Sequence, residues 1–289
     1  MRLLLIGSTG LLGQALDREA QIRGITILRA ARKGVAFAVD IAQADAVEGL
    51  IAKAAPDLVI NAAAITDVDQ CERDPGGSYL VNARAVALLA RACGKRQIKL
   101  VQVSADHFFT GDGDAKHSEE SPVHLLNEYA RNKFAAEAFA VTAPGALIVR
   151  TNITGIRGWA QPTFFEWVVD SLRHRKPMTL FADYFTSTLD ADSLAGAIFD
   201  LVDKGAHGMF NVASSEVASK RRFIEALAEA MGINFDWASE GSVRSLSVPR
   251  AESLGLDVSR AERVLGYNLP CLTAVIGRLA SRTEMAHAV

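Results

Sequence analysis

The first 24 residues constrain the fold of this chain more than any other stretch. Residues 3–6 are apolar and predict a buried strand over residues 2–6, and Gly7, Gly10 and Gly13 follow it. An amphipathic run comes next and stops at Gly24, which predicts a helix. Glycines spaced in this way between a strand and a helix allow the backbone to approach a pyrophosphate, which the helix N-terminus stabilises. The pattern therefore indicates a dinucleotide-binding unit. The predicted contacts in this loop are Gly7, Ser8, Thr9, Gly10, Leu11, Leu12 and Gly13.

A basic turn follows the second predicted strand, residues 26–28, and bears on the identity of the cofactor. Sites for NADH usually place an acid here, on the ribose hydroxyls, whereas this chain has Arg29, Arg32 and Lys33. These cations favour NADP over NAD, with Arg32 as the candidate contact. A solvated basic turn is the alternative interpretation, and NAD stays open.

Strand and helix patterns alternate along the rest of the first half. Strands are predicted at 35–39, 57–60 and 99–103, and helices at 44–54 and 75–93. This alternation is typical of an α/β fold with a doubly wound parallel sheet, the Rossmann architecture, here over residues 1–150. Small or polar residues stand where the strands end, which suits a cofactor lying across the carboxyl edge of the sheet. The predicted cofactor contacts among them are Asp40, Ile41, Asn61, Ala62, Ala63 and Ala64.

Tyr129 and Lys133 stand four residues apart in a stretch that continues as an alanine-rich helix. Residues at this spacing share a helix face, so the phenol and the ammonium are presented side by side. An adjacent lysine cation lowers the pKa of a tyrosine, which is about 10 when unperturbed. Tyr129 is therefore a candidate proton donor to a carbonyl under reduction. The alternative is a half-buried tyrosine beside a solvated lysine.

Taken in order, these motifs resemble those of the extended short-chain dehydrogenases/reductases. Three stretches, residues 61–72, 104–109 and 119–127, are similar to the dTDP-4-dehydrorhamnose reductase branch. The resemblance implies an NADPH-dependent oxidoreductase that reduces a nucleotide-linked 4-keto-6-deoxy sugar in deoxysugar biosynthesis. It also implies that Lys133 contacts the nicotinamide ribose and that Tyr129 protonates the sugar oxygen.

The second half of the chain is expected to bind the substrate. The resemblance implies that residues 151–289 form mainly a smaller, mixed α/β lobe, with a segment at about 180–205 returning to the Rossmann domain. A capping-box pattern at Ser259 and Glu262 predicts the start of a helix. The inferred substrate contacts are Thr66, Asp106, His107, Tyr129, Asn152, Trp159 and Arg250. For the tryptophan, the histidine and the arginine, the alternatives are core packing, a structural histidine and a surface arginine.

Ala105 departs from the pattern of this branch, which carries a threonine hydroxyl at the matching position. That hydroxyl helps to hold the carbonyl oxygen, and losing one such donor costs about 10²–10³ in rate. Ser104, Thr66 or a bound water is expected to take its place, and Ser104 is counted with Tyr129 and Lys133 as catalytic. Two alternatives stay open: a catalytically impaired regulatory or scaffold subunit that binds NAD(P), and an epimerase or dehydratase with tightly held NAD⁺.

Charge and cysteine content narrow the class of protein. The formal net charge is −2 with both signs mixed along the chain, which shows no electrostatic footprint for nucleic acid. Three widely spaced cysteines match neither a disulfide framework nor a zinc site, so we assign no metal. Their number and spacing also lead us to expect that the protein resides in the cytoplasm. No run is long and apolar enough for a membrane span, and a homodimer stays open.

Overall fold

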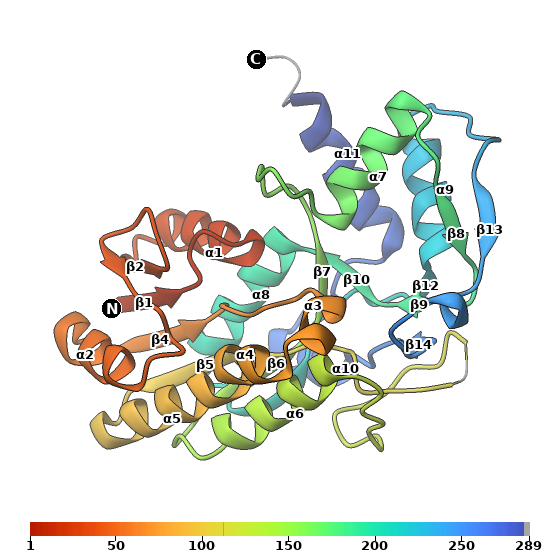
Figure 1. Cartoon of the computed structure of the whole chain (residues 1–289). Coiled ribbons are helices and arrows are strands. Elements are labelled where there is room, and N and C mark those ends of the chain that lie inside the picture. The colour runs from red at the N-terminus through yellow and green to blue at the C-terminus, as the bar shows by residue number, and fades with distance from the viewer. Residues whose placement is uncertain (112, 286–289) are drawn as a thin grey trace.

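The computed structural model describes residues 1–111 and 113–285 and is built around one parallel sheet (Figure 1). The seven strands follow the order β11-β6-β5-β4-β1-β2-β3. Because β1 pairs with β2 on one side and with β4 on the other, successive connections leave in opposite directions from this point, which opens a crevice at the carboxyl edge. The strands are β1 (Arg2–Ile6), β2 (Thr26–Ala31), β3 (Phe37–Ala38), β4 (Leu58–Asn61), β5 (Lys99–Val103), β6 (Leu147–Arg150) and β11 (Gly208–Asn211).

Helices cover both faces of the sheet, as the alternation of its side chains requires. On β1, Leu3 and Leu5 belong to one buried cluster, whereas Leu4 and Ile6 belong to another. The first cluster includes α1 (Leu11–Ile22) and α8 (Ala191–Asp203), and the second includes α2 (Ala44–Ala54) and α5 (Ala85–Arg96). The expected doubly wound α/β fold is confirmed.

The remaining helix of the first half carries the Tyr129–Lys133 pair. It is α6 (Glu128–Ala140), and it begins where the Asn127 side chain accepts a hydrogen bond from the backbone N–H of Ala130 at 2.9 Å. Three short segments precede α5, namely α3 (Val68–Arg73), α4 (Pro75–Tyr79) and a π-helical stretch (Leu80–Arg84).

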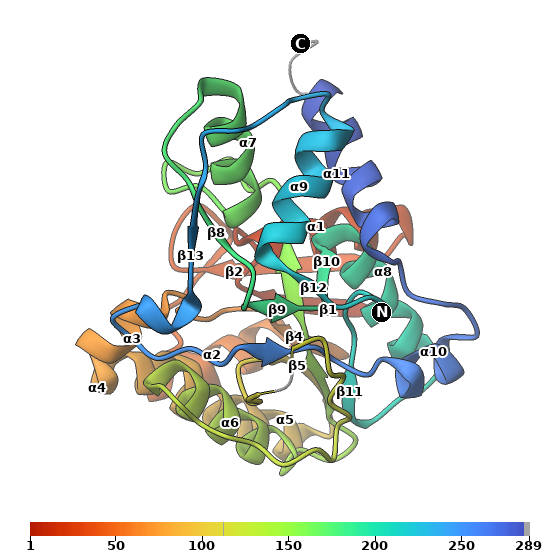
Figure 2. The ribbon, with the colours of Figure 1, turned by 90° about the vertical axis from the view of Figure 1, so that its right-hand side faces the viewer.

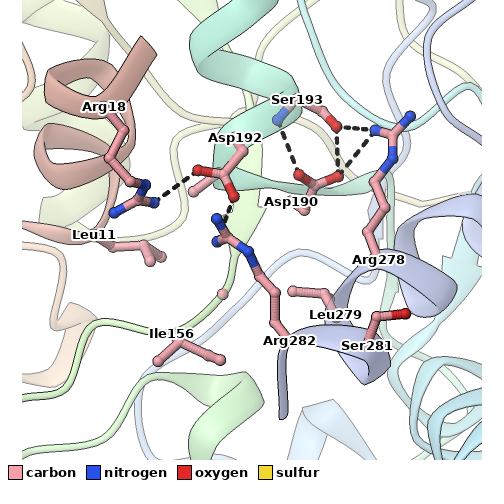
Figure 3. A pocket seen from close by; sticks show the side chains of 12 residues that line it. Leu11, Arg18, Ile156, Asp190, Asp192, Ser193, Arg278, Leu279, Ser281 and Arg282 are labelled. Atoms are coloured by element: carbon pink, nitrogen blue, oxygen red, sulfur yellow. Dashed lines mark hydrogen bonds and ion pairs between the residues drawn. The ribbon is translucent and has the colours of Figure 1, made fainter. Parts of the chain in front are cut away.

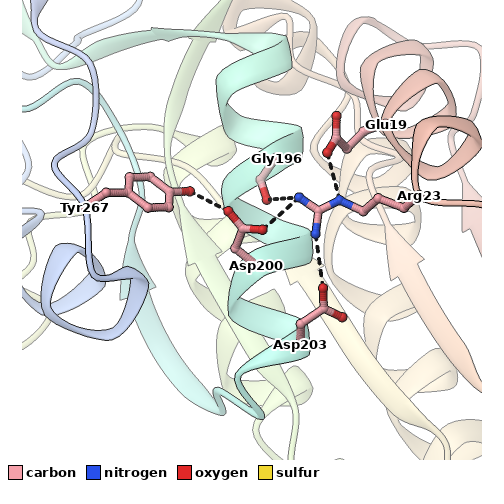
Figure 4. Close-up of polar contacts among 6 residues, drawn as sticks. All are labelled: Glu19, Arg23, Gly196, Asp200, Asp203 and Tyr267. Atoms are coloured by element: carbon pink, nitrogen blue, oxygen red, sulfur yellow. Dashed lines mark hydrogen bonds and ion pairs between the residues drawn. The ribbon is translucent and has the colours of Figure 1, made fainter.

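Arg23 fastens α8 to α1 (Figure 4). Its guanidinium group pairs with Glu19 at 2.7 Å, with Asp200 at 2.7 Å and with Asp203 at 3.1 Å. Tyr267 donates a further hydrogen bond of 2.7 Å to Asp200. A helix from the second half of the chain is thus bound to the first helix of the glycine motif.

The rest of the second half forms a smaller lobe above the carboxyl edge of the sheet, where α7, α9 and α11 gather (Figure 2). Residues 191–211 lie with the Rossmann sheet, because α8 packs on α1 and β11 pairs with β6. The division at residue 150 stays a prediction. The lobe contains β7 (Asn152–Thr154), α7 (Phe164–His174), β8 (Thr179–Phe181), β9 (Phe185–Thr186), β10 (Thr188–Asp190), β12 (Ala218–Ser219), α9 (Lys220–Ala230), β13 (Ser239–Gly241), a 3₁₀ turn (Val243–Ser245), β14 (Ser253–Leu254) and α11 (Leu272–Met285). The short helix α10 (Ser259–Leu265) packs instead on α8 and β11 of the Rossmann part.

The capping-box prediction at Ser259 is wrong. Ser259 is already the first helical residue of α10, and Glu262 accepts a hydrogen bond from the backbone N–H of Leu269 instead. The reciprocal box of the structure lies at Thr163 and Glu166, where α7 begins. Among the described residues, no helix has the length and apolar character needed to span a membrane.

Candidate active site

The glycine loop approaches the neighbouring strand end too closely for any side chain. Gly7 has a φ of +82°, and a Cβ there would lie 2.7 Å from the backbone nitrogen of Ala63. A Cβ at Gly13 would overlap the carbonyl oxygen of Gly7. These two positions require glycine, which leaves a cradle of bare backbone at the start of α1.

The N-terminus of α1 is suited to an anion. Gly10 is its cap, no side chain caps the helix, and its first turn holds no acid. The backbone N–H groups there are therefore offered to a ligand, as a pyrophosphate requires. The residues present fit an NADP cofactor, whose reduced form, NADPH, would supply hydride when bound.

Of the three basic side chains at the end of β2 and in the turn after it, one forms an ion pair and two are exposed to solvent. Arg29 pairs with Asp17 at 2.7 Å. Arg32 and Lys33 are exposed, and no ion pair within the described ranges engages them. Arg32 stays the predicted contact for a 2′-phosphate.

Among the predicted cofactor residues near the ends of β3 and β4, the polar side chains form hydrogen bonds with the nearby backbone. Asn61 is fully buried, donates to Gln102 at 2.8 Å, and accepts from the backbone N–H of Ala63 at 3.2 Å. It therefore holds the segment that contacts Gly7. Asp40 accepts a bond of 3.0 Å from the backbone N–H of Ala42, and Ile41 is buried. Ala62 and Ala64 flank Ala63 and are partly exposed.

Tyr129 and Lys133 lie one turn apart on α6, but the lysine is bonded elsewhere. Its ammonium group donates to the backbone carbonyl of Val103 at 2.7 Å. Burial, followed by the charge of Asp106, holds the pKa of Tyr129 above its ordinary value. Burial also lowers the pKa of Lys133 to about 8. The expected lowering of the tyrosine pKa by its lysine is therefore not seen, because desolvation dominates.

Ser104 and Ala105 face different surroundings. The Ser104 hydroxyl donates to Glu137 at 2.6 Å, and Glu137 pairs with Arg150 at 2.8 Å. Ala105 instead packs in one apolar cluster with Tyr129. The proton of Ser104 is thus committed to a buried ion pair, and this arrangement does not support Ser104 as the substitute hydroxyl. Thr66 is exposed ahead of α3.

A chain of polar side chains leads away from Tyr129 into the smaller lobe. Lys220 donates to the Thr188 hydroxyl at 3.4 Å, and that hydroxyl donates to Asn152 at 2.9 Å. Asn152 in turn donates to Asp106 at 2.7 Å. His107, the next residue, sets its ring edge-on to the ring of Tyr129, with centroids 5.2 Å apart.

Burial shifts the ionisation of this chain. It raises the pKa of Asp106 to about 7, a rise that the Asn152 hydrogen bond and the Lys220 cation oppose. It lowers the pKa of Lys220 to about 8 and that of His107 to about 4. His107 is therefore neutral near pH 7. At the same pH, the side chain of Asp106 is protonated in part of the molecules and ionised in the rest. Perturbed groups gathered beside a predicted proton donor indicate a functional site.

Comparison with known proteins places this geometry in a family. The sequence profile described as the RmlD substrate binding domain matches residues 1–278. The chain belongs to this family.

Its relatives in the RmlD family include named reductases. A probable low-salt glycan biosynthesis reductase, Agl14, of Haloferax volcanii is 31% identical over 278 residues, covering 92% of this chain and 93% of the relative. A dTDP-4-dehydrorhamnose reductase of Mycolicibacterium smegmatis is 31% identical over 80% of this chain and 69% of its own length. A crystal structure of the Bacillus anthracis reductase in complex with NADP is 22% identical, with a TM-score of 0.88 over 97% of this chain and 99% of that one. At that identity the likeness shows the fold.

Two predicted substrate contacts differ in their closeness to Tyr129. Arg250 is largely buried, pairs with Asp69 at 2.8 Å, and acts electrostatically on His107. Trp159 is 47% exposed and stacks on the guanidinium group of Arg157, 4.3 Å from its ring centroid. Arg250 therefore belongs to the group around Tyr129, whereas no described contact brings Trp159 there.

A cavity of about 520 Å³ lies between α1, α8 and α11 (Figure 3). Ion pairs cross it, among them Arg18 with Asp192 at 2.7 Å and Arg282 with the same carboxylate. Leu11 of the glycine loop lines this cavity, but Tyr129 and Asp106 do not. We therefore place the reaction elsewhere in this RmlD family member.

Sequence reasoning missed Lys220, Thr188 and Tyr184. The Tyr184 ring lies 5.8 Å from the Lys220 ammonium, and Asp106 acts on its phenol. Lys220 directly follows the cap residue of α9, a position where a lysine ordinarily stays in solvent. Its burial against distant segments left no local signal in the sequence.

Proposed function

We propose that this protein is an NADPH-dependent reductase of a nucleotide-linked 4-keto-6-deoxy sugar. One observation carries the proposal: Tyr129 and Lys133 lie on one helix face at the end of β5, in a chain that matches a glycan biosynthesis reductase over nearly its whole length. The glycine cradle at Gly7–Gly13 supports a dinucleotide, and Arg32 supports its 2′-phosphate.

In this proposal each residue has a defined task. Tyr129 gives its phenolic proton to the carbonyl oxygen as hydride reaches the carbonyl carbon. Lys133 contacts the nicotinamide ribose and stabilises the phenolate left behind. Arg250 is oriented toward the anionic part of the sugar nucleotide, because a guanidinium group binds phosphate through two hydrogen bonds.

A second candidate function rests on Ala105. An alanine packed against Tyr129 provides no hydroxyl, which would suit a subunit that binds NADPH without turnover. Steady consumption of NADPH with any keto-sugar excludes this candidate.

Single-turnover NADPH oxidation, followed at 340 nm with enzyme in excess over a dTDP-4-keto-6-deoxyhexose, tests the proposal. We expect loss of absorbance in the wild-type protein and none with Tyr129→Phe. Tyr79→Phe is the matched control, since it removes the same atom from an exposed tyrosine. An unchanged rate with Tyr129→Phe would refute the mechanism.

The cysteines bear on the cellular compartment. The three cysteines are free, with Cys71 and Cys93 buried, which supports a reducing cytoplasm. Whether the protein forms a homodimer stays open, and sedimentation equilibrium would decide it.

A further inference from the structure

The proposed reduction needs a hydrogen-bond donor at the carbonyl oxygen besides Tyr129. Negative charge develops on that oxygen, and a preorganised donor stabilises it. Ala105 supplies none, and the hydroxyl of Ser104 is committed to Glu137. The inference below rests on the proposed function and concerns which group replaces the missing hydroxyl.

Asp106 directly follows Ala105 and has one free oxygen. Its side chain is fully buried, and Oδ2 accepts the 2.7 Å hydrogen bond from Asn152. Oδ1 is buried and has no hydrogen-bond partner within the described residues. This oxygen lies 3.9 Å from Nε2 of His107, whose ring packs against that of Tyr129. His107 is therefore a neighbour of both the free oxygen and the ring of the proton donor.

The hydrogen bonds of this chain run in one direction. The Thr188 oxygen accepts from the Lys220 ammonium group, which can only donate, and lies 2.8 Å from the Thr186 hydroxyl. The Thr188 hydroxyl donates to Oδ1 of Asn152. The amide of Asn152 is then oriented with its NH₂ toward Oδ2 of Asp106. Because Oδ2 is an acceptor in this chain, a proton on the carboxyl group resides on Oδ1.

We propose that the carboxyl group of Asp106, in its acid form, donates a hydrogen bond from Oδ1 to the substrate carbonyl oxygen and so replaces the hydroxyl missing at Ala105. Lys220 is a positioning residue that orients this carboxyl group through Thr188 and Asn152. In the step itself, hydride passes to the carbonyl carbon and the proton of Tyr129 passes to the oxygen. Asp106 keeps its proton throughout, and the phenolate regains a proton from solvent.

The ionisation of Asp106 agrees with this role. Burial raises the pKa of the carboxyl group to about 7, so the acid form is substantially populated at neutral pH. Lys220 from α9 lowers this pKa. Tyr129 from α6 and Tyr184 from the loop before β9 also interact with the carboxyl group, and His107 lies 3.9 Å from its Oδ1. His107 is neutral, and Arg250 acts on His107 and Tyr184. A buried carboxylic acid kept neutral can serve as a donor to an oxyanion.

Variants at Asp106 test the role through the pH profile of single-turnover hydride transfer. In the wild-type protein the rate should fall as the pH rises through about 7, because the acid form is the active one. Asp106→Asn keeps an N–H donor, so we expect it to retain most of the rate and to lose this fall. Asp106→Leu should lose about 10²–10³ in rate. Lys220→Met should move the fall to higher pH, because the cation that lowers the Asp106 pKa is gone.

Two further measurements complete the test, and the second decides the proposal even where Asp106→Leu folds poorly. Ala105→Thr in the Asp106→Leu background should regain activity, since it restores a hydroxyl. Infrared difference spectra between the wild-type protein and Asp106→Asn should show the C=O stretch of a protonated carboxyl group at neutral pH. Absence of that band, or an Asp106→Leu rate equal to the wild-type rate, would overturn the inference. An inactive wild-type protein would count against the proposed function instead, and the infrared band would still test the acid form of Asp106.

Discussion

The ammonium group of Lys133 donates a hydrogen bond of 2.7 Å to the backbone carbonyl of Val103, the last residue of β5. The lysine is thereby fixed to the end of the sheet and presented on the helix face of Tyr129. Because it lies in a buried site, its charge is unfavourable, and its pKa falls to about 8. The geometry that suits catalysis therefore costs stability.

Replacing Lys133 by Met should change how stability depends on pH. The pKa of Lys133 is about 8 in the folded protein and 10.5 as its ordinary value, so in this window the unfolded chain holds more protons. Stability then rises with pH across the window, by on the order of 3 kcal/mol for a shift of this size. The free energy of unfolding of the wild-type protein minus that of Lys133→Met should rise correspondingly. Urea titrations at several pH values measure it. Lys95→Met, at an exposed lysine, should leave the rise intact, and parallel curves for Lys133→Met would contradict the prediction.

Glu137 and Arg150 form an ion pair in which both side chains are only 3% exposed. Glu137→Leu leaves the guanidinium group buried and unpaired, so we expect a loss of about 3–5 kcal/mol in the free energy of unfolding. The double variant Glu137→Leu/Arg150→Met removes both charges and should lose much less. Equal losses in the two variants would show that packing, rather than charge, determines the effect.

Gly13→Ala should abolish binding of NADPH, because its Cβ would overlap the Gly7 carbonyl oxygen in the cradle. Gly196→Ala is the matched control within a helix: nothing lies within 4 Å of the added atom, and we expect a gain of about 0.5–1 kcal/mol. Fluorescence titration with NADPH, together with thermal unfolding, separates loss of binding from loss of fold. Normal NADPH affinity in Gly13→Ala would count against the cradle.

Arg32→Ala should weaken the binding of NADPH roughly tenfold or more and leave that of NADH nearly unchanged, because only NADPH carries the 2′-phosphate. Arg29→Ala is the comparison, since Arg29 is engaged by Asp17. Titration of both nucleotides by fluorescence measures the ratio. A similar loss for NADH would mean that Arg32 stabilises the turn rather than reading the phosphate.

The periodic parts of the fold were predictable because they depend on local sequence. The strand at 99–103 and the helix at 44–54 have the predicted bounds, since a short, mostly apolar run and the helix period are both set by neighbouring positions. The helix predicted to begin at Ser259 is also present, but its capping box was not predictable, because Glu262 accepts from Leu269 and Ser259 lies inside the helix.

The candidate site was predictable only where a spacing motif carries it. Tyr129 and Lys133 follow from the helix period. The partner of Ser104 is 33 positions away, and Lys220 reaches Asp106 only through Thr188 and Asn152. Such contacts depend on the tertiary fold and cannot be predicted from neighbouring residues.

The seventh strand of the sheet has a consequence for biosynthesis. β11 pairs with β6, yet it leaves the ribosome roughly 60 residues later, several seconds at about 5–20 residues per second. Until then the nascent chain presents β6 as an open edge, which is a template for pairing with other chains. The nascent chain is therefore prone to aggregation during this interval. A holdase chaperone or the rate of translation would then determine how much of it reaches the native state.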